Sequence, residues 1–259
     1  MIKKAVYAYK LYSQHYKPLN QSFFDVARLS VFFAKKFYTT VLHCDSYTKN
    51  ELERNDVFFD EYVLHDDWPE IDSSSQSGIY KVLVISQQTD PFVLLDLDTI
   101  IFAPIVSTAD ITYGFAETSS DYMTTGNFEY VYEYYYKSYI ANKLKIDIPL
   151  YWSTFPNNSL VAFKNAAISN FAAHRILNLN LDFKKTSAQF YEQFLLYNFM
   201  RFYDAKISFL QKNLHDLSGY NIYQHMGRGF IHLNDYYKDS GKKLMKELSE
   251  GYRINLNSI

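Results

Sequence analysis

The chain has 259 residues with a formal net charge of -2, and 48% of them are hydrophobic, which suits a buried core and excludes a disordered chain. A broad nucleic-acid-binding face needs a strongly basic surface, so no nucleic-acid partner is expected. The single cysteine, Cys44, excludes a disulfide framework and a cysteine-rich zinc site. The sequence shows no apolar run long enough for a transmembrane segment, so the expectation is a cytoplasmic protein.

The first part of the chain predicts strands that alternate with helices. The predicted strands cover residues 5–9, 39–44, 61–65 and 92–95, and the predicted helices cover 22–37, 49–54 and 79–88. This order predicts an α/β fold with a mostly parallel central sheet flanked by helices. Ligands of such sheets bind beyond the carboxyl ends of the strands, so the residues that follow each strand are the candidate binding residues.

The second part of the chain is less regular. It predicts helices at 130–144, 165–177, 187–202 and 242–248, strands at 159–163 and 230–233, and a loop at 151–158. The sequence contains neither an internal repeat nor a long polar break, which favours a single domain over 1–259 with halves at 1–105 and 106–259. It also lacks the glycine motifs of dinucleotide-binding proteins, ATPases and serine hydrolases, which weakens those three interpretations.

The sharpest local signal is the pair Asp96 and Asp98 directly after the apolar strand at 92–95. Two carboxylates at i and i+2 project to one side if the chain stays extended. Carboxylates at the end of a buried strand need a partner or water, and Mg²⁺ or Mn²⁺ together with diphosphate oxygens is a natural partner. The alternative is that both acids leave the core and cap the next turn.

With this pair in place, the segment 77–102 resembles the core of glycosyltransferases with the A-type fold, which carry an Asp-x-Asp motif after a strand in a Rossmann-like nucleotide-binding half. Three later segments fit in the same order. Residues 155–163 are similar to the loop and strand that border donor and acceptor, 190–196 to a helix with a Glu-Gln pair, and 231–235 to a late strand with a metal-binding histidine. The resemblance, to a small and poorly characterised branch, rests mainly on this order.

The resemblance implies a Mn²⁺ or Mg²⁺ cofactor. Asp98 would ligate the metal, Asp96 would contact it through water or contact the ribose, and His232 would be a third ligand. The alternative for His232 is a hydrogen-bonded core histidine.

The resemblance also implies a set of residues that bind the nucleotide. These are Tyr7, Tyr9 and Asp45 for the base and ribose, and Lys81 for a phosphate or the ribose. The alternatives are ordinary strand aromatics for the two tyrosines and a solvated helix charge for Lys81. The segment 66–68 either adds a stacking ring or anchors a loop.

Sugar transfer also needs a group that accepts the proton of the acceptor hydroxyl, or an internal route that retains configuration. Glu192, Asp121 and Glu117 are candidates by residue type and region, and Glu192 is the first choice because Gln193 adds a second polar group to an aromatic helix. The alternative for Glu192 is an exposed helix charge. The stereochemical outcome stays open.

The sequence therefore predicts a metal-dependent glycosyltransferase that moves a sugar from a nucleoside-diphosphate donor, a UDP-sugar in the first instance, to a glycan or glycolipid acceptor. One alternative is a sugar nucleotidyltransferase, although residues 10–17 lack the glycine-rich loop of that class. Another is a non-catalytic module that binds nucleotide or glycan. The tyrosine-rich segment 130–137 is an acceptor platform, part of the core or an oligomer contact.

Overall fold

The computed structural model describes residues 2–11, 21–69, 78–118, 146, 148–150, 154–179, 181, 190–211, 229–232, 246–248 and 250. These residues fall into two compact units, each assembled from segments that are distant in the sequence. The described part of the first unit is 2–11, 21–67, 93–106, 229–232, 246–248 and 250, and that of the second includes 68–69, 78–92, 107–118, 154–179 and 190–211. The prediction of a single domain stays a prediction.

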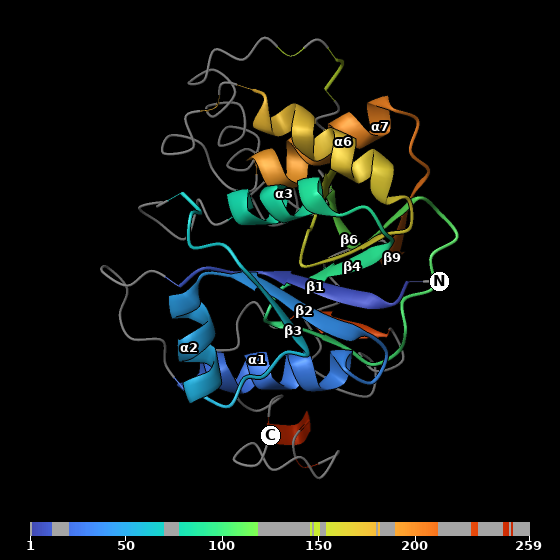
Figure 1. Cartoon of the computed structure of the whole chain (residues 1–259). Helices are drawn as coiled ribbons and strands as arrows, with labels where there is room; N and C mark the ends of the chain where they lie inside the picture. The colour runs from blue at the N-terminus through green and yellow to red at the C-terminus, as the bar shows by residue number, and fades with distance from the viewer. Residues whose placement is uncertain are drawn as a thin grey trace. The chain divides into compact units, whose positions relative to one another are not determined.

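The first unit is built on a sheet with the strand order β3-β2-β1-β4 (Figure 1). Its strands are β1 (Lys4–Ala8), β2 (Thr39–Cys44), β3 (Glu61–Leu64) and β4 (Phe92–Leu95), of which residues 93–95 belong to this unit. The pairs β1–β2 and β2–β3 are parallel, and every residue of β4 is buried. The carboxyl ends of β1, β2 and β3 therefore meet at one edge of the sheet, as the sequence predicts.

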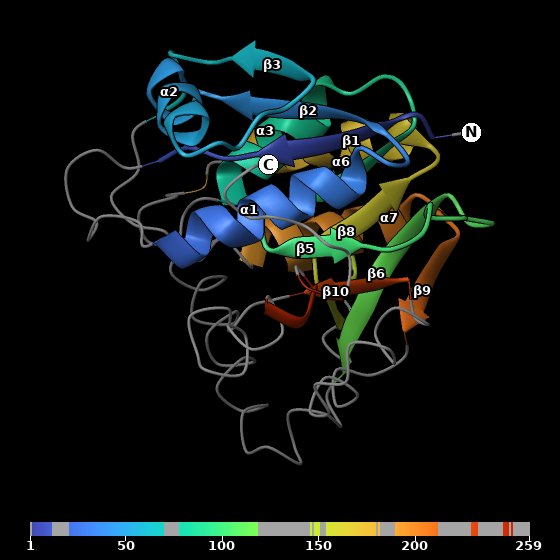
Figure 2. The same cartoon turned by 90° about the horizontal axis from the view of Figure 1, so that it is seen from below.

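Two helices, α1 (Gln21–Ala34) and α2 (Ser46–Arg54), lie along one face of the sheet of the first unit (Figures 1 and 2). Ten of the 14 residues of α1 are buried. Helix α2 begins at Ser46, three residues before the predicted start at 49, because the Asp45 carboxylate caps it by accepting a hydrogen bond of 2.7 Å from the Thr48 amide.

A second, two-stranded sheet in the first unit pairs β5 (Thr99–Ile101) with β10 (Phe230–His232) in antiparallel orientation (Figure 2). The late strand confirms the prediction at 230–233 over residues 230–232, and residue 233 lies outside the described part. Strand β5 was not predicted, because three residues are too short for a recognisable alternation.

The second unit is centred on β6 (Ile111–Thr118). This strand pairs with β8 (Leu160–Phe163) and β7 (Thr154–Pro156) in antiparallel orientation, and with β9 (Ile207–Gln211) in parallel. The sequence did not predict β6, whose pattern Gly114 interrupts, or β9, and β7 lies inside the predicted loop at 151–158.

The helices of the second unit are α3 (Gly78–Gln87), α6 (Ala166–Leu177), the π-helix η2 (Phe190–Leu195) and α7 (Leu196–Phe202). Helix α3 packs against α6 and η2, and α6 packs against α7. Of the predicted helix at 187–202, residues 190–202 are described and are helical, and the geometry changes from π to α at Leu196.

These elements confirm the predicted fold class, which is α/β with a mostly parallel central sheet flanked by helices. Among the described residues no helix is long and apolar enough to cross a bilayer. The predicted helix at 130–144 lies outside the described residues, and residues 246–248 of the predicted terminal helix are helical.

Candidate functional site

The Asp96–Asp98 segment leaves the buried strand β4 and turns instead of staying extended. The Thr99 amide donates to the Asp96 carbonyl at 3.0 Å, which closes a β-turn. Leu97 is buried with 6% exposure, whereas Asp96 and Asp98 are both half-buried. The turn therefore packs its apolar residue inward and leaves both carboxylates partly accessible, which the predicted metal site requires.

The backbone of this turn is held by a buried serine of α1. Ser30 Oγ donates to the Thr99 carbonyl at 2.6 Å and lies 3.5 Å from the Asp96 carbonyl. The Tyr7 hydroxyl lies 3.2 Å from the same Oγ. A serine hydroxyl has a single proton, and Ser30 uses it toward the turn, so Tyr7 donates to Ser30. A relay of hydrogen bonds thus connects β1, α1 and the turn.

Tyr7 is fully buried, with its ring edge-to-face against Phe59 at 5.1 Å. Burial raises the pKa of its phenol well above the usual range, against a smaller opposing effect of the hydrogen bond with Ser30. Tyr7 therefore remains a neutral donor and supports the turn from behind. Its predicted contact with base or ribose stays a prediction.

Strand β10 brings the third predicted metal ligand beside the turn. In the β5–β10 register His232 is the partner of Thr99, the residue that follows Asp98. The His232 side chain lies outside the described part, and within that part no three His, Cys, Asp or Glu side chains gather around a common point. Two carboxylates and one imidazole are a donor set that suits Mn²⁺, and carboxylates suit Mg²⁺, so the residues fit the predicted ion.

The other predicted nucleotide-binding residues of the first unit lie at the carboxyl ends of β1 and β2. Tyr9 is half-buried, its amide donates to the His43 carbonyl at 3.0 Å, and its ring lies 5.6 Å from Phe23. Asp45 caps α2, and its other carboxylate oxygen lies 3.9 Å from Nζ of the buried Lys10. The edge predicted to bind the nucleotide therefore gathers Tyr9, Lys10 and Asp45, although Asp45 already has a structural role.

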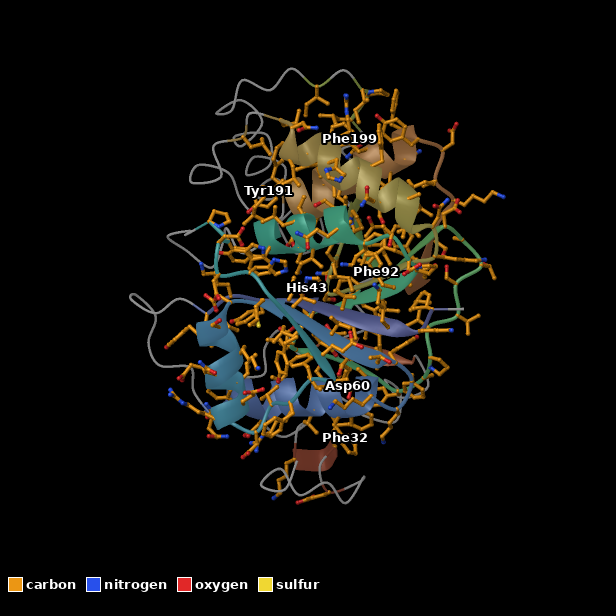
Figure 3. The ribbon with its side chains drawn as sticks, viewed as in Figure 1. Phe32, His43, Asp60, Phe92, Tyr191 and Phe199 are labelled. Carbon is orange, nitrogen blue, oxygen red and sulfur yellow. The ribbon has the colours of Figure 1, made fainter. Side chains whose placement is uncertain are left out.

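Two histidines that the sequence analysis passed over lie on the neighbouring strands at this edge. His43 on β2 (Figure 3) and His65 just after β3 face each other, with Nδ1 and Nε2 3.0 Å apart and the rings 14° from parallel. Burial, the neighbouring His65 and Lys4 together lower the pKa of His43 to about 4. Burial also lowers the pKa of His65, against an opposing effect of Asp67. One imidazole donates to the other, so the contact requires a neutral acceptor nitrogen.

Acidification is expected to destabilise the fold through His43. Its pKa in the folded chain, about 4, lies below the unfolded value near 6.5, so the folded state is stabilised above about pH 6.5 and loses that stability as the pH falls toward 4. The loss is on the order of 3 kcal/mol. Chemical denaturation of wild type and His43→Gln between these pH values measures it, because the variant should show a flatter profile. His174→Gln, on the exposed face of α6, is the control, and equal slopes for all three proteins would contradict the assignment.

In the second unit, two predicted site residues form a buried ion pair. Lys81 Nζ of α3 lies 3.3 Å from Glu192 Oε2 of η2, and the two side chains are 14% and 7% exposed. The alternatives of a solvated lysine and an exposed glutamate are therefore wrong. A buried pair of opposite charges needs close geometry to offset the loss of hydration, so α3 and η2 are fixed at this point.

The backbone around Glu192 has a geometry that sequence periodicity does not indicate. η2 is a π-helix in which Tyr191, Glu192 and Gln193 are all buried. Asn158, in the turn before β8, donates from its side-chain amide to the Glu192 carbonyl. π-helical turns occur frequently at functional sites, so the wide turn and the buried charge together single out this segment.

The side chains of two further predicted residues lie outside the described part of the chain. Asp121 is not among the described residues, and of Glu117 only the backbone in β6 is described. Trp68, from the segment considered as a stacking ring, is buried and packs face-on against Tyr80 at 4.5 Å. Its position is that of a core aromatic packed on α3.

The comparisons with known proteins return likeness in structure only. No protein-family model and no curated protein matches the chain. Mouse xyloside xylosyltransferase 1 in its apo form has a TM-score of 0.41 at 13% identity, over 78% of this chain and 82% of that chain. HddC from Yersinia pseudotuberculosis has a TM-score of 0.41 at 13% identity, and the match covers 94% of this chain and 100% of that chain. A nucleoside-diphosphate-sugar pyrophosphorylase from Vibrio cholerae RC9 has a TM-score of 0.40 at 9% identity, and the match covers 94% of this chain and 99% of that chain. Likeness at these scores assigns no function to this chain.

Proposed function

We propose that the chain is a metal-dependent glycosyltransferase that takes a sugar from a nucleoside-diphosphate donor, a UDP-sugar in the first instance, and passes it to a glycan or glycolipid acceptor. The observation that carries the proposal is the turn after β4. It leaves two carboxylates partly accessible beyond the carboxyl end of a buried strand, and the backbone register sets His232 beside it.

In this proposal Asp98 and His232 hold the cation, and Asp96 binds it through water or binds the ribose. A bound Mn²⁺ or Mg²⁺ neutralises the charge that develops on a departing diphosphate. The relay from Tyr7 through Ser30 to the Asp96 and Thr99 carbonyls fixes the backbone of the turn, so the carboxylates are in place before ligand binds. Tyr9, half-buried at the end of β1, is the proposed contact for the base or ribose.

Glu192 is the proposed proton acceptor, and Lys81 is the proposed partner that balances its charge inside the second unit. A carboxylate in a buried, aromatic environment is suited to accepting the proton of a hydroxyl because little water competes for it. The proposal covers both stereochemical outcomes, and the anomeric configuration of the transfer product distinguishes retention from inversion.

The test is calorimetric titration of UDP into the protein with Mn²⁺, with Mg²⁺ and with EDTA. We expect UDP affinity to fall at least about tenfold in EDTA, because the diphosphate then loses its bridge to the carboxylates. The same titration with ADP and GDP as controls reports the base preference. Equal affinity in EDTA would contradict the metal dependence, and release of pyrophosphate from UTP and a sugar 1-phosphate would show nucleotidyl transfer instead.

A further inference from the structure

Thr99, the first residue of β5, carries a buried hydroxyl group that has no role in the proposed site. The residue is fully buried, and its Oγ1 has no hydrogen-bond partner among the residues that the structure describes. Its main chain is fixed, because the amide donates to the Asp96 carbonyl at 3.0 Å and the carbonyl accepts from Ser30 Oγ at 2.6 Å. A buried hydroxyl without a partner costs free energy, so its presence directly after the Asp96–Asp98 turn needs a reason.

The two-stranded sheet of β5 and β10 (Figure 2) places His232 directly across from Thr99. The Phe102 amide donates to the Gly229 carbonyl at 2.7 Å, so these two residues form a hydrogen-bonded pair at the other end of the ladder. Hydrogen-bonded and non-hydrogen-bonded pairs alternate along an antiparallel ladder, which makes Thr99 and His232, three positions away, a non-hydrogen-bonded pair. Both main-chain groups of Thr99 are engaged away from β10, as this alternation requires.

A non-hydrogen-bonded pair is the closest arrangement of two residues on neighbouring antiparallel strands. The two Cα atoms are only about 4.5 Å apart, and the two residues share one face of the sheet. The unpartnered hydroxyl of Thr99 therefore belongs to the residue that the backbone sets nearest to His232 on β5.

We propose that the Thr99 hydroxyl positions the imidazole of His232 for the cation, an inference that rests on the proposed function. When one ring nitrogen of a histidine binds a metal ion, the other carries a proton, and a partner for that N–H fixes the tautomer and the orientation of the ring. The oxygen of a threonine hydroxyl can accept that proton in a hydrogen bond. Thr99 is thus a positioning residue, which acts on the cation through His232 and does not touch it.

The competing explanation is that Thr99 only fills space in the core, and Thr99→Val separates the two. Valine keeps the branched shape of threonine and replaces the hydroxyl by a methyl group. Under both explanations the substitution removes an unpaired buried polar group, so the metal-free fold should be as stable as the wild type or more stable. Only if the hydroxyl orients His232 does the same substitution also weaken metal binding.

The test is titration of the full chain with Mn²⁺ alone, with the free ion followed by its electron paramagnetic resonance signal, so no sugar transfer is needed. We expect Thr99→Val to bind Mn²⁺ at least about tenfold more weakly than the wild type, the usual loss when the partner of a metal-binding histidine is removed. Thr99→Ser keeps the hydroxyl and should retain wild-type affinity. Thermal unfolding without metal should show Thr99→Val melting at or above the wild-type temperature.

The matched control is Tyr113→Phe, which removes another fully buried hydroxyl that lacks a hydrogen-bond partner in the described part of the chain, in the second unit. It should bind Mn²⁺ like the wild type, and an equal loss there would overturn the inference. Loss of Mn²⁺ binding in His232→Ala but not in Thr99→Val would overturn this inference alone. Absence of Mn²⁺ binding in the wild type, or wild-type binding in His232→Ala, would overturn the proposed metal site as well.

Discussion

Replacing Asp98 by Asn is expected to lower sugar transfer at least about a hundredfold while leaving the fold intact. Asparagine keeps the size of the side chain and removes the charge that the proposed cation requires. Asp98 is half-buried on a turn whose described hydrogen bonds run through the backbone of Asp96 and Thr99, so the substitution leaves those bonds in place. Steady-state transfer from a UDP-sugar at saturating Mn²⁺ measures the effect.

The control for Asp98→Asn is Asp90→Asn, an exposed acid near the amino end of the same strand, β4. It should retain full turnover. A raised Mn²⁺ requirement in Asp98→Asn, with unchanged thermal unfolding, would connect the loss to metal binding. Undiminished turnover in Asp98→Asn would remove the central residue of the proposed function, and an equal loss in both variants would show that the general reduction in negative charge, and not the turn, matters.

The parts of the first unit that follow from local sequence were predictable. The apolar run at 92–95 gives β4 with its predicted bounds, since four consecutive apolar residues before two acids leave little choice of boundary. The spacing of apolar residues in 22–37 predicts a buried helix face that includes Ser30. What Ser30 does there was not predictable, because its hydroxyl binds carbonyls of a turn far along the chain. A polar residue on an otherwise apolar helix face was the available signal.

The second unit contains contacts that local sequence patterns do not predict. Periodicity predicts the helices that carry Lys81 and Glu192, but it does not say which faces of two distant helices meet, so the ion pair was not foreseen. The π-helix has no recognised sequence pattern, because its widened hydrogen bonding depends on packing against the rest of the unit. The His43–His65 contact likewise depends on the parallel register of β2 and β3, which places Val63 and not His65 opposite His43.

Replacing Lys81 by Met is expected to destabilise the protein by about 3 kcal/mol, because Glu192 then loses the ammonium group that balances its buried charge. Lys246→Met is the matched control: Lys246 faces Glu250 at 3.7 Å on an exposed surface, with side chains 74% and 66% exposed, and such pairs contribute roughly 0–1 kcal/mol. Chemical denaturation measures both. Similar losses for Lys81→Met and Lys246→Met would show that the buried pair does not stabilise the fold.

The double variant Lys81→Met with Glu192→Leu separates stability from chemistry. Two apolar side chains of similar volume can replace a buried ion pair with little loss, so the double variant should recover most of the stability that Lys81→Met loses. If Glu192 accepts the proton of the acceptor hydroxyl, the recovered protein stays at least about a hundredfold slower in transfer than the wild type. A double variant that regains both stability and turnover would make Lys81 and Glu192 a purely structural pair. The base would then have to be sought among the other acidic residues of the chain.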